Sequence, residues 1–438
     1  MKKRKQILKP FLDSSGTFAS RITTGIEENR KGNAVLEIMD QDGRHISGAS
    51  VSVALKNHAF LHGCNLFLLD EIDDPVKNET AKARFVEVFN QATLPFYWKD
   101  IEPENGKYRY GIDSPRIYRR PVPDLCLSFC ERNGIVPKAH CLNYYNETPE
   151  WVSKESAVFW KMLERRFSDL AERYADRIPE WEVTNETLRF FVEQNVRRGV
   201  SPFYDRDFVE QSFLLAEKYF PQNEKIINEA HFNIWGENFK EDRSAYYMQI
   251  ERALSRGAGI DAIGLQFHMF FPKESELRDT EHYYDPYSLF GVMDRYADFG
   301  LPLQITEITI PAYSNDPEDE EIQAMLLKNL YQIWFSHPNM LIYSASKAAQ
   351  INMVKSLAMQ LAKYGVTVNN VAPGVIYTDR NIEALSDPIY AKKVIDSIPV
   401  GFYGRPDDCA GIVSFLCSEE GRYITGQSIF VDGGKSIK

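Results

Sequence analysis

The sequence predicts an α/β protein built on a parallel (β/α)8 barrel of the TIM type whose eighth strand is missing or replaced. From residue 58 onward, seven short apolar runs alternate with longer helical segments, a pattern typical of parallel barrels. Two of these runs carry a glutamate at their polar end. After residue 340 the pattern stops, and we expect a partial Rossmann-type fragment there.

The seven runs are short enough for strands, and the segments between them are long enough for helices. The expected strands are Phe60–Phe67, Ala92–Trp98, Val136–Leu142, Trp181–Asn185, Lys225–Asn228, Ala262–Phe267 and Leu303–Ile308. The expected helices include Lys161–Tyr174, Asp207–Tyr219, Ala245–Arg256 and Glu320–Trp334. Repeated strand–helix units of this kind predict a sheet that curls on itself, with helices outside it.

The chain divides into three expected parts: an N-terminal tail with a small β element over 1–57, the barrel over 58–340, and a C-terminal segment over 341–438. Residues 1–32 are polar and weakly patterned. An apolar run at Ala34–Met39, a turn containing Gly43, and strict alternation over Ser47–Leu55 predict a β-hairpin.

Composition excludes several classes of protein. The net charge of −11 argues against a nucleic-acid or anionic-membrane partner. The six cysteines show no metal-ligand spacing, so we expect reduced core residues and no metal site. The basic start MKKRKQILKP lacks the apolar run of a secretory signal, and no apolar stretch is long enough to span a bilayer. As written, the chain is expected to be cytoplasmic.

Two strand ends carry the candidate chemistry. Trp181–Asn185 is followed by Glu186, and Leu303–Ile310 contains Glu307. Parallel barrels place catalytic groups at the C-terminal ends of their strands, so both carboxylates are expected at one mouth. Two carboxyl groups ~5–5.5 Å apart are what a retaining glycosidase needs, because one acts as nucleophile and the other as acid and base.

Five ordered motifs resemble glycoside hydrolase family 10, the endo-β-1,4-xylanases. Trp181–Glu186 is similar to the family's W-D-V-x-N-E, and Ile305–Ile308 to its I-T-E-L strand. The other three are Ile260–His268 for I-D-G-I-G-x-Q-x-H, Glu102–Gly106 for E-P-x-x-G, and His140–Trp151 for H-x-L-x-W-H-x-x-x-P-x-W. The resemblance covers roughly residues 58–340.

This resemblance implies a retaining glycoside hydrolase that acts on a polysaccharide or oligosaccharide and needs no cofactor. Glu186 would be the general acid/base and Glu307 the nucleophile. Substrate-binding residues would be His140, Asn185, Gln266 and His268, with Gln266 and His268 also orienting Glu307. Candidate sugar-stacking aromatics are Tyr97, Trp98, Tyr144, Tyr145 and Trp235, for each of which core packing is the alternative.

The chain also departs from the family pattern near the scissile bond. Leu94 and Tyr97 stand where the family's second strand has an Asn and a Lys that bind the sugar, and Tyr144-Tyr145 replace a Trp-His pair. These changes predict an altered sugar site, so a β-linked glycan other than xylan is an alternative substrate.

The C-terminal segment resembles the last third of the short-chain dehydrogenases. Tyr343 and Lys347 match the family's Y-x-x-x-K pair, Asn370–Gly374 its N-x-V-x-P-G loop, and Val431–Gly434 its V-D-G-G end. The resemblance implies NAD(P) as cofactor only if this segment is functional. No G-x-x-x-G-x-G turn follows a strand before Tyr343, so the pyrophosphate site expected of a complete enzyme is missing.

The change of character near residues 336–343 indicates a join between two coding sequences, whether natural or an artefact. All six tryptophans lie before residue 341. Met340–Tyr343 could serve as strand eight and Ala345–Tyr364 as helix eight, which would close the barrel. The alternative functions are an oxidoreductase completed by partner chains and an inactive carbohydrate-binding barrel. The sequence does not define the oligomeric state.

Overall fold

The computed structural model describes residues 3–13, 15–31, 50–52, 58–188, 207–236, 243–340, 361–377 and 398–434, with a few single positions between 358 and 395. The chain forms two compact units, Met1–Leu341 and Ile342–Lys438. We describe each unit by itself.

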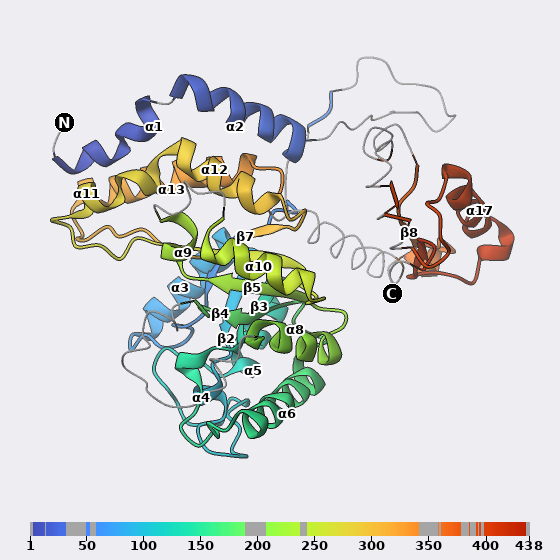
Figure 1. Ribbon diagram of the computed structural model, residues 1–438, viewed down its shortest axis with the longest axis horizontal. Coiled ribbons are helices and arrows are strands. Elements are labelled where there is room, and N and C mark those ends of the chain that lie inside the picture. The colour runs from blue at the N-terminus through green and yellow to red at the C-terminus, as the bar shows by residue number, and fades with distance from the viewer. Residues whose placement is uncertain are drawn as a thin grey trace. The chain divides into compact units, whose positions relative to one another are not determined.

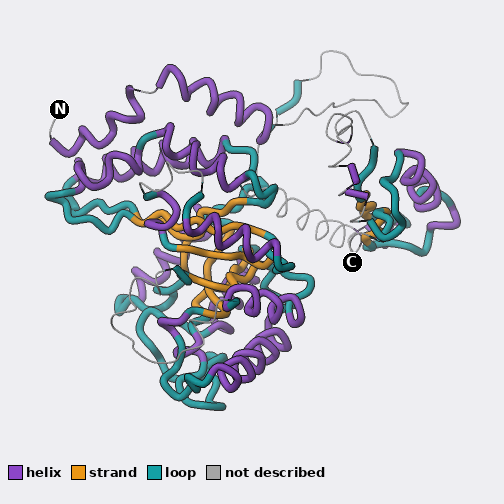
Figure 2. Tube along the Cα trace, in the orientation of Figure 1, coloured by secondary structure: helices purple, strands orange, loops and turns teal. Residues whose placement is uncertain are grey.

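The first unit is built on a sheet of seven parallel strands in chain order, curled into a half-barrel (Figures 1 and 2). The strands are β1 (Gly63–Asn65), β2 (Gln91–Pro95), β3 (Val136–Asn143), β4 (Glu180–Asn185), β5 (Glu224–Glu229), β6 (Ala262–His268) and β7 (Leu303–Thr309). Each overlaps one of the seven predicted runs, so the prediction of a TIM-type barrel that lacks a strand is confirmed.

Helices follow the strands and cover the outside of the sheet (Figure 1). The longer ones are α3 (Pro75–Val88), α5 (Pro123–Asn133), α6 (Ser156–Tyr174), α8 (Phe208–Tyr219), α10 (Ala245–Ser255), α12 (Pro286–Ala297) and α13 (Pro317–Ser336). Short helical segments lie between them: α4 (Trp98–Ile101), η2 (Tyr145–Glu147), α9 (His231–Trp235), α11 (Glu276–Thr280) and η6 (Glu281–Tyr284).

Local sequence explains where α6 begins and which side it buries. Glu155 caps it by accepting hydrogen bonds from the N–H groups of Ala157 and Val158. Capping of this kind satisfies backbone donors that have no partner inside the helix. The face at helical spacing is apolar and buried; it contains Phe159, Leu163, Phe167, Leu170 and Tyr174. The helix therefore packs against the sheet along one side.

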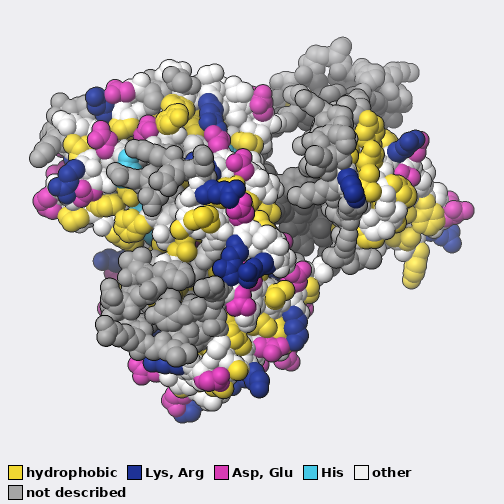
Figure 3. Space-filling view, viewed as in Figure 1, with side chains coloured by type: hydrophobic (Ala, Val, Ile, Leu, Met, Phe, Trp, Pro, Cys, Tyr) yellow, Lys and Arg dark blue, Asp and Glu magenta, His cyan; other side chains and the backbone are white. Residues whose placement is uncertain are grey.

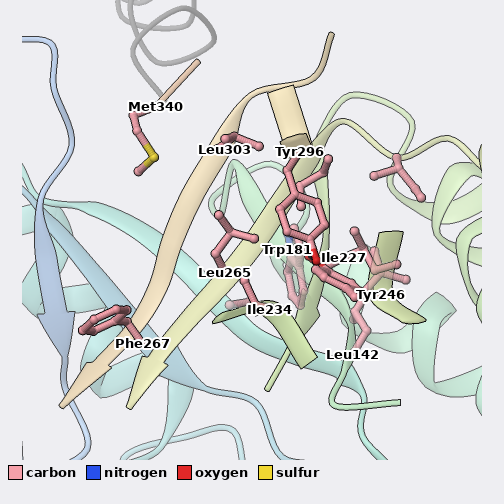
Figure 4. Packing of buried hydrophobic residues seen from close by; sticks show 14 of the residues in the cluster. Leu142, Trp181, Ile227, Ile234, Tyr246, Leu265, Phe267, Tyr296, Leu303 and Met340 are labelled. Atoms are coloured by element: carbon pink, nitrogen blue, oxygen red, sulfur yellow. Dashed lines mark hydrogen bonds between the residues drawn. The ribbon is translucent and has the colours of Figure 1, made fainter. Parts of the chain in front are cut away.

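The core lies between the strands and these helices, and aromatic side chains fill much of it. Trp181 of β4 is fully buried, with its ring 4.6 Å from that of Phe220. Tyr246 of α10 reaches the sheet, where its hydroxyl donates to the carbonyls of Ile227 and Gly264 at 3.0 Å each (Figure 4). This contact ties the helix to β5 and β6 and leaves the buried hydroxyl satisfied.

The two outer strands do not pair with each other in the part of the chain that the structure describes. Met340 makes a single parallel bridge to Leu303 at the start of β7, and the Leu303 N–H donates to the Asn339 carbonyl at 2.8 Å. Met340 thus lies where an eighth strand would begin (Figure 4). Leu341–Tyr343 lie outside the described residues, so the proposed strand eight stays a prediction.

Residues 3–30, which the sequence suggested were an unpatterned tail, form helices η1 (Lys3–Leu8), α1 (Lys9–Asp13) and α2 (Ser15–Arg30). Helix α2 packs along α13 (Figure 1). The Arg30 guanidinium donates to the carbonyls of Phe335 and His337 at 2.5 and 2.6 Å, at the end of α13. Of the predicted β-hairpin over 34–55, only residues 50–52 are described, and they form neither helix nor strand.

The second unit contains a two-stranded parallel sheet of β8 (Asn370–Pro373) and β9 (Ser428–Val431). Helix α17 (Pro406–Leu416) and the short segments η7 (Ala362–Tyr364) and η8 (Glu419–Gly421) accompany it. Hydrophobic side chains gather on the visible face of this unit (Figure 3). Among the described helices of the whole chain, none has the length and apolar content to cross a bilayer.

Candidate active site

Glu186 lies just beyond the end of β4, as expected of a residue at a strand mouth. Its backbone is in the left-handed region, with φ of 51°, and its N–H donates to the Asn228 carbonyl on β5 at 3.1 Å. The Tyr144 hydroxyl donates to its carboxylate at 2.8 Å. Contacts to both neighbouring strands therefore fix the direction in which Glu186 points.

Glu307 lies inside β7, and three side chains donate to its carboxylate. Asn228 and Gln266 reach one oxygen at 3.0 Å each, and His268 Nε2 lies 3.1 Å from the other. Burial by itself raises the pKa of Glu307, but the charge of His140 and the hydrogen bond from His268 outweigh it, so the pKa lies below its usual value. Glu307 is therefore held as an anion.

A network of amides joins the ends of β4, β5 and β6. Asn185 Oδ1 accepts hydrogen bonds from Asn228 at 2.8 Å and from Gln266 at 3.1 Å, the same two amides that bind Glu307. Among the described residues, no partner accepts from Asn185 Nδ2. The Asn185 amide group thus keeps a free donor next to the two glutamates.

His140, Glu182 and Lys138 form a buried charged group beneath Glu307. Glu182 accepts from Lys138 Nζ at 2.6 Å and contacts His140 Nδ1 at 2.5 Å. His140 Nδ1 also lies 3.9 Å from Glu307. Burial lowers the pKa of His140, but the charges of Glu182 and Glu307 raise it by more. The charge of His140 favours ionised Glu307, and the contact with Glu182 holds His140 in place.

Sequence reasoning missed Lys138, Glu182 and Asn228 as parts of the site. A signal was present, because Lys138 and His140 are two residues apart, as are Glu182 and Thr184, and residues two apart in a strand share a face. Buried strands with several charged residues on one face predict a polar network inside the barrel. His268, in contrast, lies where expected; its Nδ1 is 2.9 Å from Thr309 Oγ1, which fixes the ring toward Glu307.

Both glutamates line one cavity of about 880 Å³. His140, Gln266 and His268 also line it, so the sequence-predicted residues other than Asn185 share this space. The cavity extends from the strand mouth to Met340 on the side where β1 and β7 do not pair. Its volume lies in the range of ~300–1,000 Å³ that is usual for small-molecule sites.

Four of the five aromatic side chains suggested for sugar stacking are buried instead. Tyr97, Trp98, Tyr145 and Trp235 each have at most 9% of their surface exposed, so they serve the core. Tyr144 is half-buried and contacts Glu186. The exposed aromatics that line the cavity are Phe232 and Phe270, which the sequence analysis did not select. Two further phenyl faces are thus available to a sugar ring.

His140, Glu182 and Glu307 are the described group whose ligand atoms lie close enough, within 4.8 Å, to hold a metal ion. The ammonium group of Lys138 already binds Glu182 and supplies a positive charge there. Burial raises the pKa of Glu182, but the charges and hydrogen bonds of Lys138 and His140 lower it by more, to about 2. This geometry favours a structural ion-pair network over a metal centre.

The family comparison decides the identity of the larger unit. The profile described as "Glycosyl hydrolase family 10" matches residues 73–345, more than half of the chain. The chain belongs to glycosyl hydrolase family 10. It is therefore a glycoside hydrolase by family, and the resemblance inferred from its motifs is confirmed.

Solved structures similar to this family 10 chain include xylanases. Xylanase 10B from Thermotoga petrophila, in complex with xylobiose, is 20% identical with a TM-score of 0.46; the match covers 64% of this chain and 79% of that one. Xylanase XynB from Paenibacillus barcinonensis is 18% identical with a TM-score of 0.46, covering 64% and 82%.

The C-terminal segment matches a second family profile, "Enoyl-(Acyl carrier protein) reductase", over residues 330–436. The 3-oxoacyl-[acyl-carrier-protein] reductase FabG of Rickettsia felis is 45% identical over 101 residues, 22% of this chain and 40% of that protein. L-rhamnose 1-dehydrogenase (NAD(P)(+)) of Azotobacter vinelandii is 44% identical over 92 residues, which are 21% of this chain and 36% of that protein. This family 10 chain thus spans less than half the length of those relatives.

Only parts of the dehydrogenase-like segment are described. Tyr343 and Lys347 lie outside the described residues, as does the whole segment from 341 to 357. The matched loop at Asn370–Gly374 forms strand β8 and the turn after it, and Val431–Gly434 lies at the end of β9.

Proposed function

We propose that this chain hydrolyses a β-1,4-linked glycan with retention, using Glu307 as nucleophile and Glu186 as general acid and base. The observation that carries the proposal is that both carboxylates line the same cavity at the mouth of the barrel. The depressed pKa of Glu307 supports its role, because a nucleophilic carboxylate must be ionised.

The two roles require opposite protonation states at the start of the reaction. Ionised Glu307 attacks the anomeric carbon and forms a glycosyl ester, while Glu186 gives its proton to the departing glycosidic oxygen. Glu186 then takes a proton from water, whose oxygen attacks the anomeric carbon and releases Glu307. The hydrogen bond from the Tyr144 hydroxyl supports one orientation of the Glu186 carboxyl group in both steps.

The free donor of Asn185 supports a contact with the substrate. A hydroxyl next to the anomeric carbon gains partial charge in the transition state, and a hydrogen bond to it strengthens there. Gln266 and His268 act on Glu307 in this proposal, since both hydrogen-bond its carboxylate. The xylanase names of several solved structures favour a xylan-like substrate, and the changed positions Leu94 and Tyr97 favour an altered fit.

Turnover of aryl β-xylobiosides tests the proposal. Glu307→Gln is expected to lower kcat/KM by more than about 10³-fold, because the covalent step loses its nucleophile. Glu186→Gln is expected to lose about 10²–10⁴-fold on 4-nitrophenyl β-xylobioside. The loss is expected to be smaller on the 2,4-dinitrophenyl substrate, whose leaving group needs no proton.

Glu104→Gln is the matched control, because this carboxylate is exposed and pairs with Lys107 on the surface. It is expected to turn over at the wild-type rate. An unchanged rate in Glu307→Gln would contradict the assignment. A wild-type chain that binds xylobiosides without cleaving them would instead favour an inactive carbohydrate-binding barrel.

A further inference from the structure

The cavity is lined by an arginine whose guanidinium has no partner among the described residues. Arg119 lines the same space as Glu186 and Glu307, and its side chain is exposed. Among the described residues, no carboxylate or carbonyl accepts a hydrogen bond from its guanidinium. Because this side chain is exposed and lines the cavity, its guanidinium is available to a ligand.

The two other arginines of the same loop are engaged in structure. Arg116 pairs with Glu71 at 2.7 Å. Arg120 pairs with Asp100 at 2.8 Å, and its guanidinium lies 4.3 Å from the centre of the Tyr97 ring. These contacts anchor the loop on both sides of Arg119, which is exposed and lines the cavity.

Buried contacts also fix the backbone of this loop. Arg109, only 3% exposed, donates to the carbonyls of Pro115 and Arg120 and, at 3.1 Å, to that of Asp100. Arg119 itself has φ of 60°, a conformation that residues other than glycine seldom adopt. Such a conformation persists where the surroundings hold it, and it is concentrated at ligand-binding positions.

The charges of the cavity indicate what Arg119 binds. Ionised Glu307 repels an anionic sugar, and the positive charge of Lys138 is already taken by Glu182. An unpaired guanidinium held at the mouth offsets that repulsion and matches a carboxylate with two parallel hydrogen bonds. A neutral sugar needs no such charge.

We propose that the glycan bound in this cavity carries a uronic acid, and that Arg119 binds its carboxylate. This inference rests on the proposed function, because it assumes that the cavity holds a sugar. It names the substrate class, an acidic β-linked glycan, and makes Arg119 the residue that determines specificity for it.

A pair of probes isolates the carboxylate. 4-Nitrophenyl β-D-glucuronide and 4-nitrophenyl β-D-glucoside differ only at C6, which is a carboxylate in one and a hydroxymethyl group in the other. Binding of each is measured by calorimetry on the full-length chain carrying Glu307→Gln, which prevents hydrolysis. The glucuronide is expected to bind about tenfold more tightly, since charge-assisted hydrogen bonds are about twice as strong as neutral ones.

Adding Arg119→Gln is expected to reduce the ratio of the two dissociation constants to about one, with the glucoside constant unchanged. Arg119→Lys is expected to keep part of the preference, because it retains the charge but loses the planar fork. Arg132→Gln removes the same charge from an exposed position on α5 that does not line the cavity, and it is expected to leave the ratio unaltered. The preference should weaken above about 0.1 M salt, since Arg119 is exposed.

An unchanged ratio in Arg119→Gln would overturn the inference, as would equal binding of the two glycosides or no binding of either. A failure of the proposed hydrolytic function would give a different experimental result. In that case Glu307→Gln would leave aryl xylobioside turnover intact, while the binding ratio and its dependence on Arg119 would still be measurable.

Discussion

At the scale of single residues, the charge state of the site depends on groups beneath its surface. Glu182 is fully buried, yet its pKa lies near 2 because Lys138 and His140 outweigh the effect of burial. It holds His140 close to Glu307, whose own pKa is lowered in turn. Glu182 therefore links the stability of the barrel to the ionisation of the nucleophile.

Removing Glu182 is expected to destabilise the chain. Glu182→Gln leaves the buried Lys138 ammonium without its closest anion, and breaking a buried pair from one side costs about 3–5 kcal/mol. Urea unfolding at pH 7 measures this loss. Adding Lys138→Met is expected to recover part of it, because the uncompensated charge is then gone.

A surface pair gives the comparison for this prediction. Glu164 accepts from Lys218 at 2.6 Å, but both side chains are largely exposed. Because water and salt screen such pairs, Glu164→Gln is expected to leave the unfolding midpoint unchanged. Equal effects of Glu164→Gln and Glu182→Gln would contradict the role given to the buried pair.

Glu229 should make stability depend on pH in the neutral range. Burial raises its pKa to about 7, although the N–H groups of Leu188 and Ala230 lower it. The neutral form is favoured in the fold, so its contribution is complete below the unfolded pKa of about 4.3 and is lost as pH rises to about 7. The loss is up to about 3 kcal/mol.

Unfolding free energies between pH 4 and 8 test this expectation. Glu229→Gln removes the titrating group, so its stability should vary less over this range than that of the wild type. The readout is the slope of stability against pH, so a constant difference in stability between the two proteins does not affect the test. Parallel curves for the two proteins would contradict the raised pKa.

The sequence predicted Glu186 and Glu307 at one mouth of the barrel because barrel topology brings strand ends together; in the structure Glu186 lies just beyond β4, Glu307 lies inside β7, and both line one cavity. It did not reveal Lys138 or Asn228, whose roles depend on which neighbour each strand meets. Nor did it separate the buried Trp98 and Trp235 from exposed Phe232 and Phe270. Burial of an aromatic is a property of tertiary packing, which a single motif does not encode.

At the scale of elements, the helix that the sequence concealed is α2. Its glycines, serines and threonines favour other conformations, and its apolar residues are few. It forms because it packs along α13, and because Phe18 also stacks on Phe290 of α12 with ring centres 5.7 Å apart. Tertiary contacts override weak propensity here.

Gly25 marks the closest approach of these two helices. A Cβ added to it would lie 2.3 Å from the backbone oxygen of Ser336, at the end of α13. Alanine is the better helix former by about 1 kcal/mol, yet Gly25→Ala is expected to destabilise the chain, because backbone must move. The thermal unfolding midpoint measures which effect is larger.

Gly16 provides the matched control within the same helix. Nothing lies within 4 Å of a Cβ added there. Gly16→Ala is therefore expected to leave stability unchanged or to raise it by up to about 1 kcal/mol. If Gly25→Ala behaved like Gly16→Ala, the packing of α2 against α13 would not be as close as the structure shows.

At the scale of the whole molecule, the two units differ in how much apolar surface they bury. The first has a large core of strands and helices. In the second, described side chains such as Phe402, Tyr423 and Phe430 are 58%, 98% and 57% exposed, and its sheet has two strands. Two-stranded sheets are marginally stable in water, so the second unit is expected to be the weaker one.

The distribution of tryptophan allows the units to be followed separately. All six tryptophans lie before residue 341, so tryptophan fluorescence reports the first unit alone, whereas far-ultraviolet circular dichroism reports helices and strands of both. In urea, the dichroism is expected to begin changing before the fluorescence does. Coincident curves would mean one cooperative transition, as expected of a single folding unit, and would contradict independent folding of the barrel.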